Sequence, residues 1–168
     1  MKQPLSVQTA PNGRRLALIQ LGGLAVVGTA ILAVSPRAHS TPASPLLEVW
    51  KDPNCGCCKD WVALMTEAGF EVKTHDTGNR AKRQELGLSE SLGSCHTATV
   101  GGYVVEGHVP ADAIQRLLRE RPRALGLTVP GVPIGSPGMD GPAYGGRKDV
   151  FNVLLVLADG RTRVWQAG

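Results

Sequence analysis

Aromatic residues are scarce in this sequence and make up only 4% of its 168 residues. A protein that binds single-stranded nucleic acid needs aromatic side chains on which the bases stack, so this scarcity argues against such a function. The net charge of +4 does not favour it either, because the positive excess lies at the N-terminus. From Thr41 onward, the sequence contains fourteen basic and fourteen acidic residues, so its net charge there is zero. We therefore expect no nucleic-acid partner.

The first forty residues contain no aspartate or glutamate. A pair of arginines precedes an apolar run over residues 16–34, and the small residues that end at Ser40 are typical of a signal-peptidase site. This pattern predicts an export signal over residues 1–40, cleavage before Thr41 and a periplasmic location; the arginine pair resembles a twin-arginine signal. The alternative is an anchor on the periplasmic face of the inner membrane, because the apolar run is long enough to span a bilayer. Only that alternative brings the protein into contact with a membrane.

A single domain is predicted to follow a short Pro/Ser/Ala linker at residues 41–45 and to occupy residues 46–168. Residues 125–147 are rich in glycine and proline and are predicted to form one long loop. The remaining pattern predicts a strand at 46–51, a helix from Cys57 or Cys58 to Ala68, a strand at 70–74, a short helix at 79–86, a helical turn at 89–92, strands at 97–100 and 103–106, a helix at 110–121, and a hairpin at 150–157 and 161–165. This order predicts an α/β sandwich of the thioredoxin type, in which helices flank a small central mixed sheet.

The four cysteines carry the strongest chemical signal. Cys55, Cys57 and Cys58 fall within four residues, after a predicted strand and at the start of a predicted helix. A helix N-terminus stabilises a thiolate, which is both the nucleophile of disulfide chemistry and a ligand for soft metals. In a thioredoxin-like fold, the segment that enters the third strand lies beside this loop, so Cys95 is predicted to join the cluster. Thioredoxins usually carry a cis-proline at that place, and a cysteine there favours a ligand.

Several uses of these cysteines remain open from their spacing. Cys55 and Cys58 can form a local disulfide and leave Cys57 and Cys95 free, as in a metal-free thiol–disulfide oxidoreductase. An interaction domain stapled by zinc or by disulfides is a further alternative. The crowded spacing suits a zinc tetrahedron poorly, and it favours a thiolate-bridged cluster of several Cu(I) ions.

Four further side chains are candidate ligands. His96 is adjacent to Cys95, whereas His75 and His108 are isolated histidines, which more often have a structural role. Met139 lies in the Gly/Pro-rich loop, and its thioether suits Cu(I). This loop is expected either to fold over the cysteines as a lid that offers the Met139 sulfur, or to be a mobile surface connection.

Four stretches of the chain together resemble the CopG-like copper-resistance family, a thioredoxin-like domain that was formerly of unknown function. They are WKDPNCGCCKDW at residues 50–61, SCHTA at 94–98, EGHVPA at 106–111 and VPGVPIGSPGM at 129–139. The resemblance covers nearly the whole predicted domain. It implies an exported protein that binds copper through its cysteines and contributes to copper tolerance. It also implies Cu(I)/Cu(II) redox chemistry, as in a copper oxidoreductase, with copper ions and other periplasmic copper-handling proteins as partners.

Overall fold

The computed structural model describes residues 44–168 of the chain. The predicted export signal and most of the predicted linker lie outside these residues. Within the described part, every helix is too short or too polar to cross a membrane.

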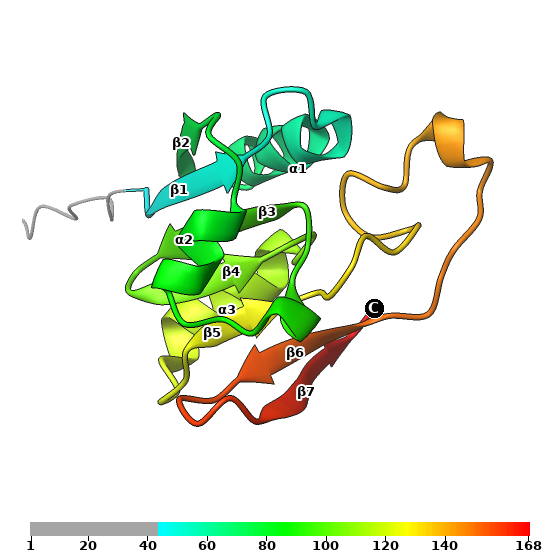
Figure 1. Ribbon diagram of the computed structural model, residues 1–168. Coiled ribbons are helices and arrows are strands. Elements are labelled where there is room, and N and C mark those ends of the chain that lie inside the picture. Colours follow the sequence, from blue (N-terminus) through cyan, green and yellow to red (C-terminus); the bar gives the residue numbers. More distant parts are fainter. Residues whose placement is uncertain (1–43) are drawn as a thin grey trace, which may run out of the picture. The chain divides into compact units, whose positions relative to one another are not determined.

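The described residues form a mixed series of strands and helices, shown in Figure 1. In chain order they are β1 (Leu46–Lys51), α1 (Gly56–Glu67), β2 (Glu71–His75), α2 (Arg80–Glu85), the 3-10 helix η1 (Glu90–Leu92), β3 (His96–Val100), β4 (Tyr103–Glu106), α3 (Ala111–Glu120), β5 (Gly126–Thr128), the 3-10 helix η2 (Pro142–Tyr144), β6 (Asn152–Val156) and β7 (Thr162–Ala167). Apart from β5 and η2, these elements lie within one or two residues of their predicted positions.

The strands form one mixed sheet in the order β2-β1-β3-β4-β5-β6-β7. Strand β1 is parallel to β2 and antiparallel to β3, and β3 is antiparallel to β4. With α1 between β1 and β2 and α3 after β4, this half of the sheet has the thioredoxin arrangement. The predicted α/β fold of the thioredoxin type is confirmed, although the sheet is larger than the small one predicted.

The main core lies between the sheet and two helices, α1 and α3. The indole N–H of Trp61 on α1 donates to the backbone carbonyl of Val109, two residues before α3, at 2.9 Å. The fully buried core includes Leu47, Val49, Trp61, Ala98, Val105, Ile114, Leu117 and Leu155. Each buried leucine, isoleucine or valine side chain contributes about 1.5–3 kcal/mol when it leaves water. A smaller cluster of Leu88, Val104 and Val156 occupies the other face of the sheet, where α2 lies.

Strand β5 corrects the prediction of one uninterrupted loop over residues 125–147. It pairs in parallel with β4 and antiparallel with β6, and so joins the final hairpin to the rest of the sheet. A side chain at Gly126 would collide with the backbone of Val104 on β4, so this close strand pairing requires glycine. The signal was missed because a three-residue strand that begins with glycine and is followed by Pro130 resembles a turn.

Candidate metal centre

The turn between β1 and α1 places three cysteines around the first turn of the helix. The side chain of Asp52 accepts from the backbone N–H of Asn54 at 2.8 Å, and its carbonyl accepts from that of Cys55 at 3.1 Å. These bonds reverse the chain after the strand. Cys55 is then the N-cap of α1, and its sulfur accepts from the backbone N–H of Cys58 at 3.3 Å. The helix begins at Gly56, one residue before the earliest predicted position.

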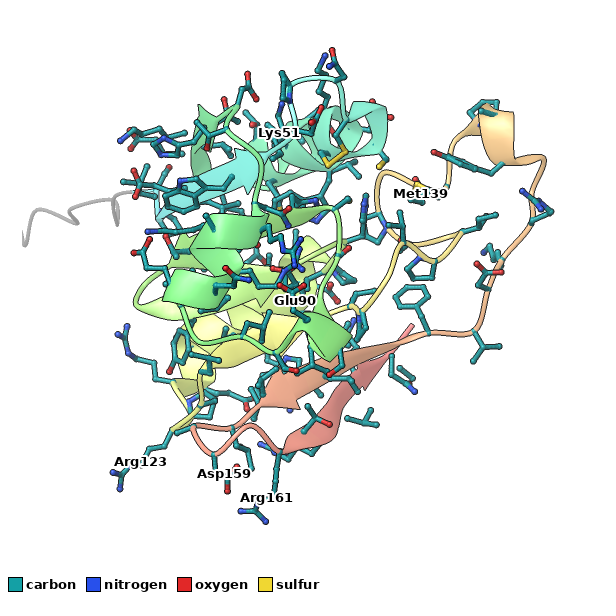
Figure 2. The ribbon with its side chains drawn as sticks, in the orientation of Figure 1. Lys51, Glu90, Arg123, Met139, Asp159 and Arg161 are labelled. Atoms are coloured by element: carbon teal, nitrogen blue, oxygen red, sulfur yellow. A yellow bond between two sulfur atoms is a disulfide. The ribbon has the colours of Figure 1, made fainter. Side chains whose placement is uncertain are left out.

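Cys55 and Cys58 form a disulfide, which leaves Cys57 and Cys95 as free thiols. The Cys57 sulfur lies 3.6 Å from the Cys55 sulfur and 4.0 Å from the Cys95 sulfur. Cys95 comes from the segment that enters β3, and the structure places it beside the cysteine loop, where the strand order predicted it. Figure 2 shows the disulfide at the N-terminal end of α1. All four sulfur atoms lie within 4.8 Å of one another.

His108 directs one ring nitrogen at the free thiols. Its Nδ1–H donates to the carbonyl of Pro137 at 2.7 Å, which leaves Nε2 as the unprotonated nitrogen of a neutral ring. This Nε2 atom lies 3.0 Å from the Cys95 sulfur and accepts from its thiol. Burial lowers the pKa of His108 and the Pro137 carbonyl opposes the shift, so the ring is neutral near pH 7. A metal-binding histidine is typically held by such a backbone contact on its other nitrogen.

His96 is the second histidine beside the Cys95 sulfur. It is fully buried on β3, and its ring lies against the ring of Trp61 with centroids 4.3 Å apart. Its Nδ1 atom lies 3.5 Å from the Cys95 sulfur, whereas Nε2 has no hydrogen-bond partner within residues 44–168. Burial, with smaller effects from His108 and Lys51, lowers the pKa of His96 to about 3. The ring therefore stays neutral and keeps a free lone pair.

The Cys95 thiol holds its proton in the absence of a metal. Burial, followed by the neighbouring Cys57, raises the pKa of this thiol to about 12. A metal that binds here must displace the proton, so its affinity depends on pH.

The donor set fits a soft or borderline metal. The two groups of metal-binding side chains that the structure brings together are the four cysteines and the set Cys95, His96 and His108. Thiolates and imidazoles suit Cu(I) and Zn(II), whereas Mg(II) and Ca(II) require oxygen ligands, and neither group contains a carboxylate.

Comparison with known proteins gives the family. A family model described as a protein of unknown function, DUF411, matches residues 92–139. A solved structure described as copper resistance protein copG, Form 2, is 40% identical, with a TM-score of 0.68, and the match covers 74% of this chain and 98% of that one. A second, described as Form 1, is 42% identical with a TM-score of 0.67 and coverages of 73% and 96%. A search of curated proteins gave no match.

This chain belongs to the CopG copper-resistance family. The resemblance seen in its sequence motifs is therefore confirmed. The cysteine cluster of the structure is consistent with a role in copper resistance.

In this CopG-family chain, the loop after β5 packs against the cysteine helix. A side chain on Gly138 would lie 2.9 Å from the Cys57 carbonyl oxygen and 2.8 Å from the Trp61 backbone nitrogen, so the loop touches the first turns of α1. Met139 follows on the same loop, as Figure 2 shows, and its sulfur accepts from the Tyr144 hydroxyl at 3.1 Å. The contact with Tyr144 is the only polar contact found for this sulfur among the described residues.

Of the three predicted histidine ligands, His75 is the one that neither group contains. It lies on β2, where its ring stacks on Trp50 with centroids 4.6 Å apart, and its Nε2 atom is 3.6 Å from the carboxylate of Glu48.

Sequence reasoning missed the polar residues behind Cys95. Ser94 is held by Arg83 on α2 and by Glu106 at the end of β4. No spacing rule connects these residues, because three different elements contribute them. A glutamate that ends an otherwise apolar strand, YVVE at residues 103–106, was the only signal in the sequence.

Proposed function

We propose that this protein binds Cu(I) through its cysteine cluster and contributes to copper tolerance in the periplasm. The observation that carries the proposal is the convergence of two free thiols and one imidazole. Cys95 lies 4.0 Å from Cys57, sulfur to sulfur, and 3.0 Å from Nε2 of His108. Two thiolates and a neutral imidazole supply the soft donors that Cu(I) prefers. The CopG structures, described as copper resistance proteins, support copper as the ion.

The state of the Cys55–Cys58 pair sets how much copper the site holds. With the disulfide formed, Cys57, Cys95 and His108 remain as ligands, with His96 beside them. Reduction adds two thiolates within 4.8 Å of the others. Thiolate sulfurs can bridge metal ions, so the reduced protein binds several Cu(I) ions in one cluster. We propose Met139 as an additional ligand. Other periplasmic copper-handling proteins are the proposed partners.

The disulfide also supports a redox activity. Two Cu(II) ions that each take one electron from the reduced Cys55 and Cys58 become Cu(I), while the two thiols lose two protons and form the disulfide. The neighbouring Cys57, whose sulfur lies 3.6 Å from that of Cys55, and Cys95 then retain Cu(I). The two electrons that the thiols lose are those that the two Cu(II) ions gain, so this step needs no other oxidant or reductant.

A metal-free thiol–disulfide oxidoreductase is the second candidate, because the same disulfide lies at a helix N-terminus, where such enzymes carry their reactive cysteine. Protein purified without oxygen separates the alternatives by its metal content and its number of free thiols. Copper at one equivalent or more supports the copper proposal. Zinc at about one equivalent supports a stapled domain. A reducible disulfide without bound metal supports the oxidoreductase.

The ligand set is tested by competition with a chromophoric Cu(I) chelator. Cys55→Ser, Cys58→Ser and Cys95→Ser, each made in the reduced protein, are expected to lose roughly tenfold or more in Cu(I) affinity, as is His108→Gln. His75→Gln is the matched control, and its affinity should stay within about twofold of the parent. Parental affinity in all four ligand variants would show that copper does not bind at this cluster.

The redox proposal has its own test. Reduced protein mixed with two equivalents of Cu(II) under argon should form two equivalents of Cu(I) and one Cys55–Cys58 disulfide, detected by peptide mass mapping. In Cys58→Ser that disulfide cannot form, so a yield equal to that of the parent would assign the electrons to another source.

A further inference from the structure

Three polar side chains, two of them buried, hold both peptide groups of Ser94, the residue before Cys95. The Ser94 backbone N–H donates to Oε1 of Glu106 at 2.7 Å. The Ser94 carbonyl accepts from the Arg83 guanidinium at 2.9 Å and from the Asn79 amide at 3.1 Å. We call Asn79, Arg83 and Glu106 the Ser94 clamp. It leaves the backbone before Cys95 little freedom to rotate.

The clamp is built on a buried ion pair. Arg83 Nε lies 2.9 Å from Oε1 of Glu106, whose side chain is fully buried. The Thr97 hydroxyl donates to the other carboxylate oxygen at 2.6 Å. A second guanidinium nitrogen lies 2.9 Å from the carboxylate of Glu90 on η1, which is labelled in Figure 2. Desolvation offsets most of the attraction in a buried pair, so its net contribution to stability is small. Its effect lies in the geometry that it imposes on its neighbours.

The clamp connects the two segments that carry the metal-binding side chains. Cys95 follows Ser94 directly, and His108 follows Glu106 after one glycine. Gly107 has a φ of +72°, and its backbone N–H donates to the carbonyl of His96 at 2.9 Å. A side chain at Gly107 would collide with Ser94, so the segments lie in direct contact. One carboxylate therefore fixes Cys95 relative to His108.

We propose that Arg83 and Glu106 are positioning residues of the metal centre, which hold the Cys95 sulfur and His108 Nε2 at the separation a shared Cu(I) ion requires. They bind no metal themselves. This inference rests on the proposed function for its copper readout, but it makes a separate claim about the metal-free protein, namely that the Ser94 clamp keeps the Cys95 thiol in place.

The variants are Glu106→Gln and Thr97→Val. Glu106→Gln has the shape of the parent side chain but removes the charge that faces Arg83. Thr97→Val removes one of the three donors to Glu106 and leaves the bond to Ser94, so it tests the clamp if Glu106→Gln does not fold. Val153→Ala on β6 is the control, because it weakens the buried core at a strand that is not adjacent to β3 or to the loop carrying Cys95.

The first readout needs no metal. In a Cys57→Ser background with the Cys55–Cys58 disulfide intact, Cys95 is the one free thiol, and its alkylation rate measures its exposure. We expect the rate to rise several-fold in Glu106→Gln, to rise less in Thr97→Val, and to stay at the parental value in Val153→Ala. The second readout is Cu(I) affinity in the parent background, which should fall about 10–100-fold in Glu106→Gln.

The outcomes separate the two proposals. If the parent protein does not bind Cu(I), the proposed function fails, and the alkylation rates still decide the role of the clamp. If the parent binds Cu(I), parental alkylation and affinity in both Glu106→Gln and Thr97→Val overturn the positioning role. Equal effects in Val153→Ala and Glu106→Gln overturn it too, because they would reflect general loss of stability.

Discussion

We expect acid to destabilise the metal-free protein through His96. Burial lowers the pKa of this imidazole from an ordinary 6.5 to about 3, with smaller contributions from His108 and Lys51. The unfolded chain then binds a proton more readily than the folded one at any pH between these values. The contribution of His96 to the free energy of unfolding is therefore fully present above pH 6.5 and is lost as the pH falls toward 3.

The magnitude follows from the two pKa values. Between pH 7 and pH 5, the folded His96 stays neutral while its unfolded counterpart becomes almost fully charged, which removes about 2 kcal/mol of stability. His108, whose pKa burial also lowers, acts in the same direction. The Glu106 carboxyl acts in the opposite direction, because burial raises its pKa. A comparison of variants cancels these other contributions.

Urea denaturation at pH 7 and pH 5, without metal or reductant, measures the effect. His96→Phe keeps an aromatic ring against Trp61 and removes the titrating group, so its loss of stability on acidification should be smaller by about 2 kcal/mol. Val153→Ala is the control, because it weakens the core without removing a titrating group, and its loss of stability on acidification should equal that of the parent. An identical loss in His96→Phe and the parent would refute the reasoning.

Three further predictions concern the loop and the leader. Gly138→Ala should lower the free energy of unfolding, measured in urea, by about 1–3 kcal/mol, because φ is +83° and the added carbon would meet the backbone of α1. Gly141→Ala is the control, since Gly141 has open space around it, and should lower that free energy by less than about 0.5 kcal/mol. Equal losses in the two variants would contradict the packing of the loop on α1. Bound Cu(I) should slow proteolysis within residues 125–147, and Met139→Ala should speed air oxidation of the bound ion; if neither rate changes, the loop is an ordinary connection. Intact-mass measurement of periplasmic extract should find a chain that begins near Thr41, and a full-length chain in the membrane fraction would instead favour the anchor.

The sequence by itself determined that a cluster of cysteines lies at the start of a helix, and it placed that start to within one residue. Three cysteines after an Asp-Pro-Asn turn predict a cysteine cluster at a helix N-terminus, and the structure places Cys55 at the N-cap, in a disulfide with Cys58. Turn dipeptides are a second local signal. Gly101-Gly102 lies in the turn between β3 and β4, and Asp159-Gly160 in the turn between β6 and β7, as predicted. These features depend on residues close together in the chain, so their local patterns suffice.

Only the tertiary structure decided that His108 joins His96 beside the Cys95 thiol. Adjacency to Cys95 favoured His96, whose Nδ1 atom lies 3.5 Å from the Cys95 sulfur. Nothing comparable in the sequence favoured His108, which contacts the Cys95 sulfur through Nε2 and the Pro137 carbonyl through Nδ1. The partners of His108 come from segments 13 and 29 residues away. The number of residues between two positions does not tell where a side chain points. The direction of the His108 ring is set by the packing of the sheet, the loop and the buried Glu106, because these contacts exist only once the strands have paired.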